Sequence, residues 1–130
     1  MEVLVKEAIE VISDTSDKPF FMYFNPTVPH SSNSITTALD DFTCLHTPGG
    51  LLDTEPVIDG MTFDSTTNTA ISCADYRQSI KDRAGTDDDD WGSLWLDDSV
   101  GALLKALETA GKLDNTIFLF QTDHGMAAKR

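Results

Sequence analysis

The sequence predicts an α/β fold in which parallel strands are flanked by helices, and three observations support this class. Residues 20–24 and 116–122 are runs of apolar, β-branched and aromatic residues, typical of strands buried on both faces of a parallel sheet. Residues 3–12 and 94–110 place apolar side chains at helical spacing. The order helix, strand, long excursion, helix, strand is the order of parallel strands joined by a crossover.

The first helix and the first strand are predicted from the N-terminal part of the chain. The helix at 3–12 ends near Ser13, where Ser and Asp side chains compete for backbone hydrogen bonds. Its buried face is expected to comprise Leu4, Val5, Ala8, Ile9 and Ile12. The strand at 20–24 follows Pro19, whose missing N–H is harmless at a strand start. Two prolines in the next loop hold the backbone extended and present His30 beyond the strand.

The middle of the chain is predicted to be mostly loop. Residues 31–69 are rich in Ser, Thr, Asp, Gly and Pro, so we expect a long excursion with little regular structure. A loop of that length in a compact domain is usually functional or a covering lid. A short helix is predicted at 74–84. The four carboxylates at 87–90 predict a solvated loop, because the alternating ligands and the Gly of an EF-hand loop are missing.

The clearest helix is predicted at 94–110. Gly111 suits the position after a helix C-cap, and the chain then turns at 113–115 into the strand at 116–122. The buried stripe of this helix is expected to comprise Leu96, Val100, Leu103, Leu104 and Leu107. Two parallel strands and a few helices cannot close such a layer. Residues 1–130 are therefore expected to be one piece of a larger α/β domain, incomplete at both ends.

Composition and charge limit the function. The 130 residues are 40% hydrophobic, as in ordinary globular domains, but their net charge of -13 argues against nucleic acid as a partner. No apolar stretch approaches the length of a membrane span, and the acidic N-terminus lacks the basic flank of a signal peptide, so localisation is not assigned. Cys44 and Cys73 stand outside a CxxC zinc spacing and are expected to be structural or free thiols.

Asp123, His124 and Gly125 directly follow the strand at 116–122, which is where open α/β sheets bind their ligands. The glycine lets the backbone turn sharply away. An aspartate offers a hard oxygen ligand to a divalent cation, and a histidine can ligate metal or donate to a substrate oxygen. The alternative is that Asp123 caps a following helix and His124 lies in a turn. The spacing of these residues alone does not decide between a ligand-binding site and this structural alternative.

Two stretches, KPFFMYFNPTVPH and LDDSVGALLKALETAGKLDNTIFLFQTDHG, occur in that order. Together they place Lys-Pro-Phe-Phe before a strand and Pro-His, then a helix, Asp-Asn-Thr, a second strand and Asp-His-Gly. This ordered combination resembles the central part of the type I, formylglycine-dependent sulfatases of the alkaline phosphatase-like superfamily. The resemblance implies that the fold is part of an alkaline phosphatase-like sandwich, and that the activity is hydrolysis of sulfuric esters.

The resemblance also implies roles for four residues. Asp123 would be a ligand of a divalent cation, expected to be Ca2+. His124 stands where many members have a metal-coordinating Asn, and an imidazole is a poorer calcium ligand than a carbonyl oxygen. His30 matches the histidine that contacts the ester oxygen and helps the leaving group depart. Lys129 matches a catalytic lysine that holds a sulfate oxygen. The implied substrate is a sulfated small molecule or sulfated glycan, and the implied compartment is secreted, lysosomal or periplasmic.

The nucleophile motif of that family, Cys (or Ser)-x-Pro-x-Arg, does not occur among the 130 residues. Cys73 and Arg77 have the right separation, but Asp75 replaces the proline and the segment follows His30 in the wrong order. The early acidic pair of metal ligands is also missing. The formylglycine is therefore expected in a preceding segment, and these 130 residues alone are expected to be inactive.

Two alternative functions stay open. One is a phosphodiesterase or phosphatase-type member of the same superfamily, because phosphate and sulfate esters share tetrahedral geometry. The other is a non-catalytic pseudoenzyme or glycan-binding remnant, although the net charge of -13 argues against a general polyanion binder. The sequence does not assign the sulfate ester or the oligomeric state.

Overall fold

A computed structural model describes residues 1–14, 16, 18–26, 28, 32–41, 44–47, 50–86 and 88–122. The helices are α1 (Glu2–Ser13), α2 (Ser32–Asp40), α3 (Cys73–Ala84) and α4 (Asp88–Thr109), followed by the 3-10 turn η1 (Leu113–Asn115). The strands form two short antiparallel hairpins, β1 (His46–Thr47) with β2 (Gly50–Leu51) and β3 (Phe63–Asp64) with β4 (Thr69–Ala70). This mixture of helices and a little sheet is consistent with a partial α/β domain.

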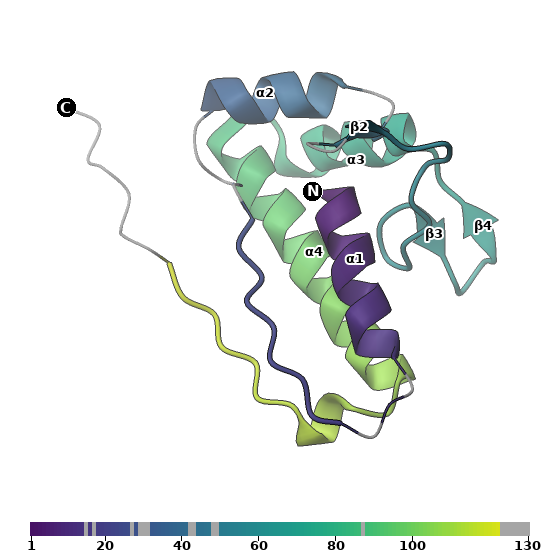
Figure 1. Cartoon of the computed structure of the whole chain (residues 1–130). Coiled ribbons are helices and arrows are strands. Elements are labelled where there is room, and N and C mark those ends of the chain that lie inside the picture. The colour runs from purple at the N-terminus through teal and green to yellow at the C-terminus, as the bar shows by residue number, and fades with distance from the viewer. Residues whose placement is uncertain are drawn as a thin grey trace.

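The long helix α4 organises the molecule (Figure 1). It contacts α1, α2 and α3, and α1 runs beside it in the same direction. The hydrophobic core lies where these helices meet, and it also takes in the loop before β3 through Ile58 and Met61. Apolar burial between the helices is the main favourable term that holds such an arrangement together.

The predicted helices are present, but parts of their predicted faces are wrong. In α1, Val5, Ala8 and Ile12 are buried as expected, whereas Leu4 is 48% exposed. In α4, Leu103 and Leu107 are buried. Leu96, Val100 and Leu104 are only half-buried. The face of α4 that packs on the core is therefore rotated about the helix axis from the predicted one. The core positions of that face are Trp95, Ser99, Ala102, Leu103 and Leu107.

Two predictions of loop structure are corrected. The excursion at 31–69 contains α2 and both hairpins, so it has regular structure. The acidic run at 87–90 is not simply a loop, because α4 already begins at Asp88. Carboxylates in a first helical turn are favoured by the positive end of the helix dipole, which explains why the helix can extend into the run.

The helix ends follow standard capping chemistry. The Ser72 hydroxyl accepts a 3.1 Å hydrogen bond from the backbone N–H of Asp75 at the start of α3. After α4, Gly111 has a φ of 67°, and the Lys112 N–H donates to the carbonyl of Leu107 over 2.8 Å. That bond and the left-handed glycine satisfy carbonyls that the helix end leaves unpaired, as the sequence predicted for Gly111.

A buried ion pair joins α1 to α3. Arg77 donates to both carboxylate oxygens of Glu2, over 3.0 and 2.9 Å, across 75 residues of sequence. Its remaining nitrogen donates to the carbonyls of Ala38, over 2.9 Å, and Asp41, and its guanidinium lies 5.2 Å from the ring centre of Trp95. Both charged side chains are almost completely buried. The bidentate geometry and the two carbonyls therefore compensate for desolvation of the guanidinium.

The two predicted strands at 20–24 and 116–122 are extended, but the structure does not assign them as strands. Within the described residues, no backbone hydrogen bond joins either one to another segment beyond the turn at Thr116. The first packs only one side on the helices, through Met22 and Phe24, while Phe21 is 92% exposed. The prediction of buried strands is thus wrong for the described residues, because each segment has no partner strand.

The Glu2–Arg77 pair gives a first testable prediction. Replacing Arg77 with Met leaves the buried Glu2 carboxylate without its bidentate partner and with the N-terminal ammonium of Met1, 3.4 Å away, as its remaining charged neighbour, so the free energy of unfolding is expected to fall by about 3 kcal/mol. The double variant Glu2→Met, Arg77→Met removes both charges and is expected to lose much less. Urea denaturation at pH 7 measures both, and equal losses in the two variants would contradict a charge-pairing role.

The same pair predicts a pH dependence. Burial by itself would raise the pKa of Glu2, but the hydrogen bonds from Arg77 and the positive charges of the N-terminal ammonium and of Arg77 outweigh it and hold that pKa below its ordinary value of 4.5. The unfolded state therefore binds the proton first, and the stability from this group is present above about pH 4.5 and lost as pH falls through the lower folded pKa. Glu2→Gln is expected to flatten the stability curve in that acidic range.

Candidate functional site

The four predicted site residues lie outside the described residues. These are His30, Asp123, His124 and Lys129. The structure does describe the extended segments that lead to them, residues 18–26 and 116–122. Both segments run in the same direction, from the η1 end of the molecule toward the α2 end (Figure 1). The described parts of both segments therefore lead toward the same end of the molecule.

Lys112 holds the beginnings of both segments together. Its ammonium donates to the carbonyls of Ile12 and Asp14, over 2.7 and 2.6 Å, where α1 ends. It also lies 5.8 Å from the ring centre of Phe20, at the start of the first segment. The second segment begins at Thr116, whose hydroxyl donates to the Lys112 carbonyl over 2.8 Å. One residue therefore contacts the C-terminal end of α1, the first segment and the second.

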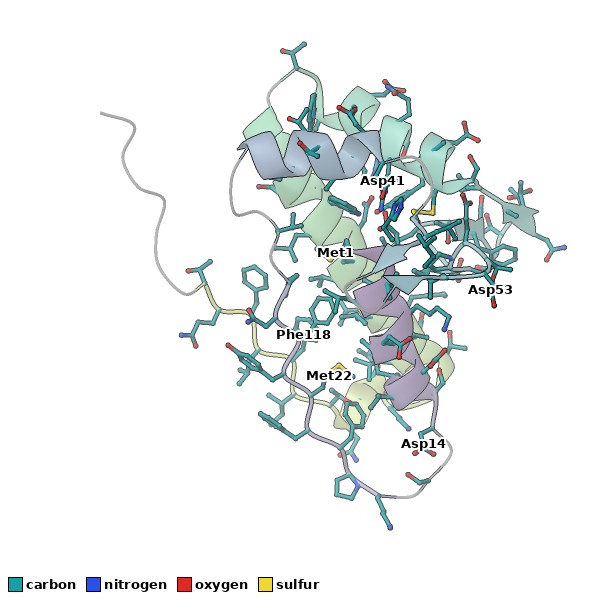
Figure 2. All side chains as sticks on the ribbon, turned by 45° about the horizontal axis from the view of Figure 1, so that its top comes forward. Met1, Asp14, Met22, Asp41, Asp53 and Phe118 are labelled. Carbon is teal, nitrogen blue, oxygen red and sulfur yellow. A yellow bond between two sulfur atoms is a disulfide. The ribbon has the colours of Figure 1, made fainter. Side chains whose placement is uncertain are left out.

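The first segment is also fixed along its length. Met22, Phe24 and Val28 pack against the helical core, and Figure 2 shows Met22 between its own segment and the helices. Val28 is the last described residue before His30 in the sequence. The chain is thus anchored on the core until two residues before that histidine, although the histidine itself lies outside the described residues.

Neither cysteine can serve as a nucleophile precursor. Cys44 and Cys73 form a disulfide across 29 residues, and both are buried. The free-thiol alternative from the sequence is therefore wrong. Arg77, the arginine at the family spacing from Cys73, is occupied by Glu2. These contacts agree with the rejection of this segment as a formylglycine site.

The sequence gave no role to one polar pair that the structure reveals. His46 and Asp41 lie 2.8 Å apart, Nδ1 to Oδ2, on the surface near the disulfide (Figure 2 labels Asp41). A carboxylate at Nδ1 orients the imidazole and fixes its tautomer. Their separation of five residues across a loop matches no regular spacing, so no sequence signal would have paired them. The histidine side chain is 65% exposed.

The described carboxylates are mostly committed to structural partners. Asp98 accepts from Tyr76 over 3.1 Å and from Arg83 over 3.0 and 2.5 Å. Burial, together with the charge of Asp98, raises the pKa of Tyr76. Asp64 accepts from the side chain and backbone of Thr66 and from the backbone of Thr67, which lowers the pKa of Asp64 to about 2. These pairings stabilise loops and helices.

The described part of the chain does not fit a divalent metal. It contains no group of three or more His, Cys, Asp or Glu side chains placed to hold one. The predicted ligands Asp123 and His124 lie outside the residues on which this result rests. The structure therefore leaves the predicted calcium site as a prediction, carried by those two residues alone.

The helical layer with two extended segments on one side corresponds to part of an α/β domain. The sequence model of the Sulfatase family matches residues 1–130, the whole of the chain. The chain therefore belongs to the sulfatase family, as its motifs indicated. No curated protein and no solved structure matches it.

Family membership carries a few general properties. Sulfatases act on sulfate esters and generally use a metal ion, and they are usually secreted or lysosomal proteins. A disulfide suits such oxidising compartments. Among the described residues, no helix is long and apolar enough to cross a membrane.

The disulfide gives a second testable prediction. Without reductant, iodoacetamide is expected to alkylate neither cysteine in the folded chain, and an aldehyde-reactive hydrazide is expected to label neither position. Reduction is expected to lower the free energy of unfolding by about 3 kcal/mol, because the unfolded chain regains the freedom of a loop of 29 residues. The double variant Cys44→Ala, Cys73→Ala is the control, since added reductant should leave its stability unchanged.

Proposed function

We propose that this chain supplies His30, Lys129, Asp123 and His124 to the active site of a sulfatase that hydrolyses a sulfate ester. Family membership supports the reaction class. The observation that carries the placement is the common direction of the two extended segments from their shared contact with Lys112. In the sequence, His30 follows the first segment and Asp123 follows the second, and the described parts of both segments lead toward the same end of the fold.

Each residue has a chemical task in this proposal. His30 donates a proton or a hydrogen bond to the ester oxygen that leaves with the alcohol. Lys129 places a point charge against a sulfate oxygen. Asp123 and His124 hold a divalent cation, proposed to be Ca2+, whose charge stabilises the negative charge on the sulfuryl group. The nucleophile motif is not among residues 1–130, so a polypeptide that carries it is required for turnover.

The substrate side of the proposal is a sulfated small molecule or a sulfated glycan. An acidic chain with net charge -13 repels such an anion unless cationic groups are concentrated at one point. Lys129 and the proposed cation provide that concentration. A general polyanion-binding surface is disfavoured by the same net charge.

The need for a nucleophile gives a third testable prediction. The purified 130-residue chain is expected to release no p-nitrophenol from p-nitrophenyl sulfate, with or without added Ca2+. A complete sulfatase of the family in the same assay serves as the positive control. Turnover by the 130-residue chain would show that its own residues supply the nucleophile, and would contradict the proposal as stated.

A fourth prediction tests the residue roles in a polypeptide that joins this segment to the nucleophile motif. His30→Ala is expected to lower kcat about 10²–10⁴-fold on an alkyl sulfate, where the leaving group needs an acid. The loss on p-nitrophenyl sulfate is expected to be smaller, because p-nitrophenolate leaves readily without a proton. His46→Ala, at an exposed histidine, is the matched control and should preserve both rates.

The proposed roles of Asp123 and Lys129 are tested by substitutions in the same enzyme. Asp123→Ala is expected to abolish activation by the metal, whereas Asp53→Ala, at an exposed aspartate, should leave it unchanged. Lys129→Ala is expected to raise KM, with Lys105→Ala as the surface control. Preference for p-nitrophenyl phosphate over the sulfate would assign the chain to the phosphate-ester branch of the superfamily. Equal rates for His30→Ala and the parent enzyme would remove the leaving-group role.

A further inference from the structure

The side chain of Lys112 holds the base of the first extended segment, residues 18–26. Its ammonium donates to the carbonyls of Ile12 and Asp14, over 2.7 and 2.6 Å, at the C-terminal end of α1. Carbonyls there have no partner within the helix, and the negative end of the helix dipole favours a cation. The same ammonium lies 5.8 Å from the ring centre of Phe20, a distance at which an aromatic face attracts a cation. The Lys112 side chain therefore joins the end of α1 to the segment that follows it.

The backbone of Lys112 holds the base of the second extended segment, residues 116–122. Its N–H donates to the carbonyl of Leu107 in the last turn of α4, over 2.8 Å. Its carbonyl accepts from the N–H of Asn115 over 3.1 Å and from the hydroxyl of Thr116 over 2.8 Å. Figure 1 shows that both segments begin near this turn. A substitution of the Lys112 side chain keeps these backbone contacts, so it releases the first segment and leaves the second in place.

The other contacts of the first segment do not fix its position along its own length. Met22, Phe24 and Val28 pack against the helical core, and apolar packing is non-directional, so it tolerates a lengthwise shift. Among the described residues, no backbone hydrogen bond joins the first segment to the second. The contacts that fix where the first segment starts are therefore those of the Lys112 ammonium at its base.

We propose that Lys112 is a positioning residue, whose side chain fixes the first segment lengthwise against the second. The catalytic consequence rests on the proposed function, because His30 follows the first segment and Asp123 follows the second in the sequence. Lys112 touches no substrate in this proposal. Its task is to hold the segment that leads to the leaving-group donor in one position relative to the segment that leads to the metal ligand. A misplacement of about 1 Å in an active site can cost about 10²-fold in rate.

The first experiment measures the two segments in the 130-residue chain and needs no enzymatic activity. Spin labels on Tyr23→Cys and Ile117→Cys, at positions 80% and 88% exposed, report the distance between the segments, since Cys44 and Cys73 are held in their disulfide. One narrow distance distribution is expected for the parent chain. Lys112→Met is expected to broaden or shift it with unchanged helical circular dichroism, because water can hydrate the two released carbonyls.

Matched variants separate the charge from its position. Lys112→Arg keeps a cation with several N–H donors, so it is expected to restore the narrow distribution. Lys105→Met is the control, because Lys105 pairs with Glu108 on the surface of α4, and it should leave the distribution unchanged. If Lys112→Met does not fold, Lys112→Gln removes the charge but keeps an amide donor and is expected to broaden the distribution as well. The same distribution in the parent chain and in these uncharged variants would overturn the proposal, whatever the activity of the complete enzyme.

The second experiment measures the catalytic consequence in a polypeptide that joins this segment to the nucleophile motif. Lys112→Met is expected to lower kcat about 10–10²-fold on an alkyl sulfate and less on p-nitrophenyl sulfate, which is the pattern expected for His30→Ala. In a His30→Ala background the same change is expected to add less than about twofold, because both changes act on one step. Activation by the metal should be unchanged, because Asp123 follows the segment that the Lys112 backbone retains.

The two experiments distinguish failure of this inference from failure of the proposed function. A role in folding alone would lower the rates on both esters and the metal response together, and would add fully to the loss from His30→Ala, so that result would overturn the positioning role. Unchanged kcat in Lys112→Met would also overturn it. If the parent enzyme hydrolyses no sulfate ester, the proposed function fails, while the distance experiment still decides whether Lys112 fixes the segments.

Discussion

The ion pair between Glu2 and Arg77 unites the helical layer. One guanidinium reaches the carboxylate at the start of α1, a carbonyl in α2 and another just after it, and the face of Trp95 in α4, from its own position in α3. All four helices therefore depend on one side chain whose charge cannot be left unpaired without a large cost. The extended segments rest on this layer, so the geometry that leads toward the proposed site depends on a contact remote from it in sequence.

Local sequence was sufficient for the elements with a strong period. The apolar spacing of α1 and α4, the Ser72 cap of α3 and the glycine after α4 all carry physical signals within a few residues. It failed for α2, whose Ser- and Thr-rich sequence reads as loop but folds as a helix because Ile35 and Leu39 enter the core. It also failed for the apolar segments: their side chains favour strands, but a strand requires a partner, which local sequence does not provide.

The candidate site was predicted from the sequence through the family's ordered motifs, and its four residues lie outside what the structure describes. The structure adds the common direction of the two segments and the contacts of Lys112, neither of which could be read from spacing. The Cys44–Cys73 link was equally hidden, because their separation carries no periodic signal and only the packing of α2 on α3 brings them together. The Asp41–His46 pair was hidden for the same reason.

The link between Cys44 and Cys73 also constrains how the protein is made. Cys73 lies 29 residues after Cys44, at the start of α3, so the bond cannot close until Cys73 itself has left the ribosome and met an electron acceptor. During synthesis the segment between Cys44 and Cys73 is therefore not yet constrained by the disulfide. Because disulfides form in oxidising compartments, this bond is expected to close only after the chain has been translocated. A chain retained in the cytosol would keep Cys44 and Cys73 as free thiols.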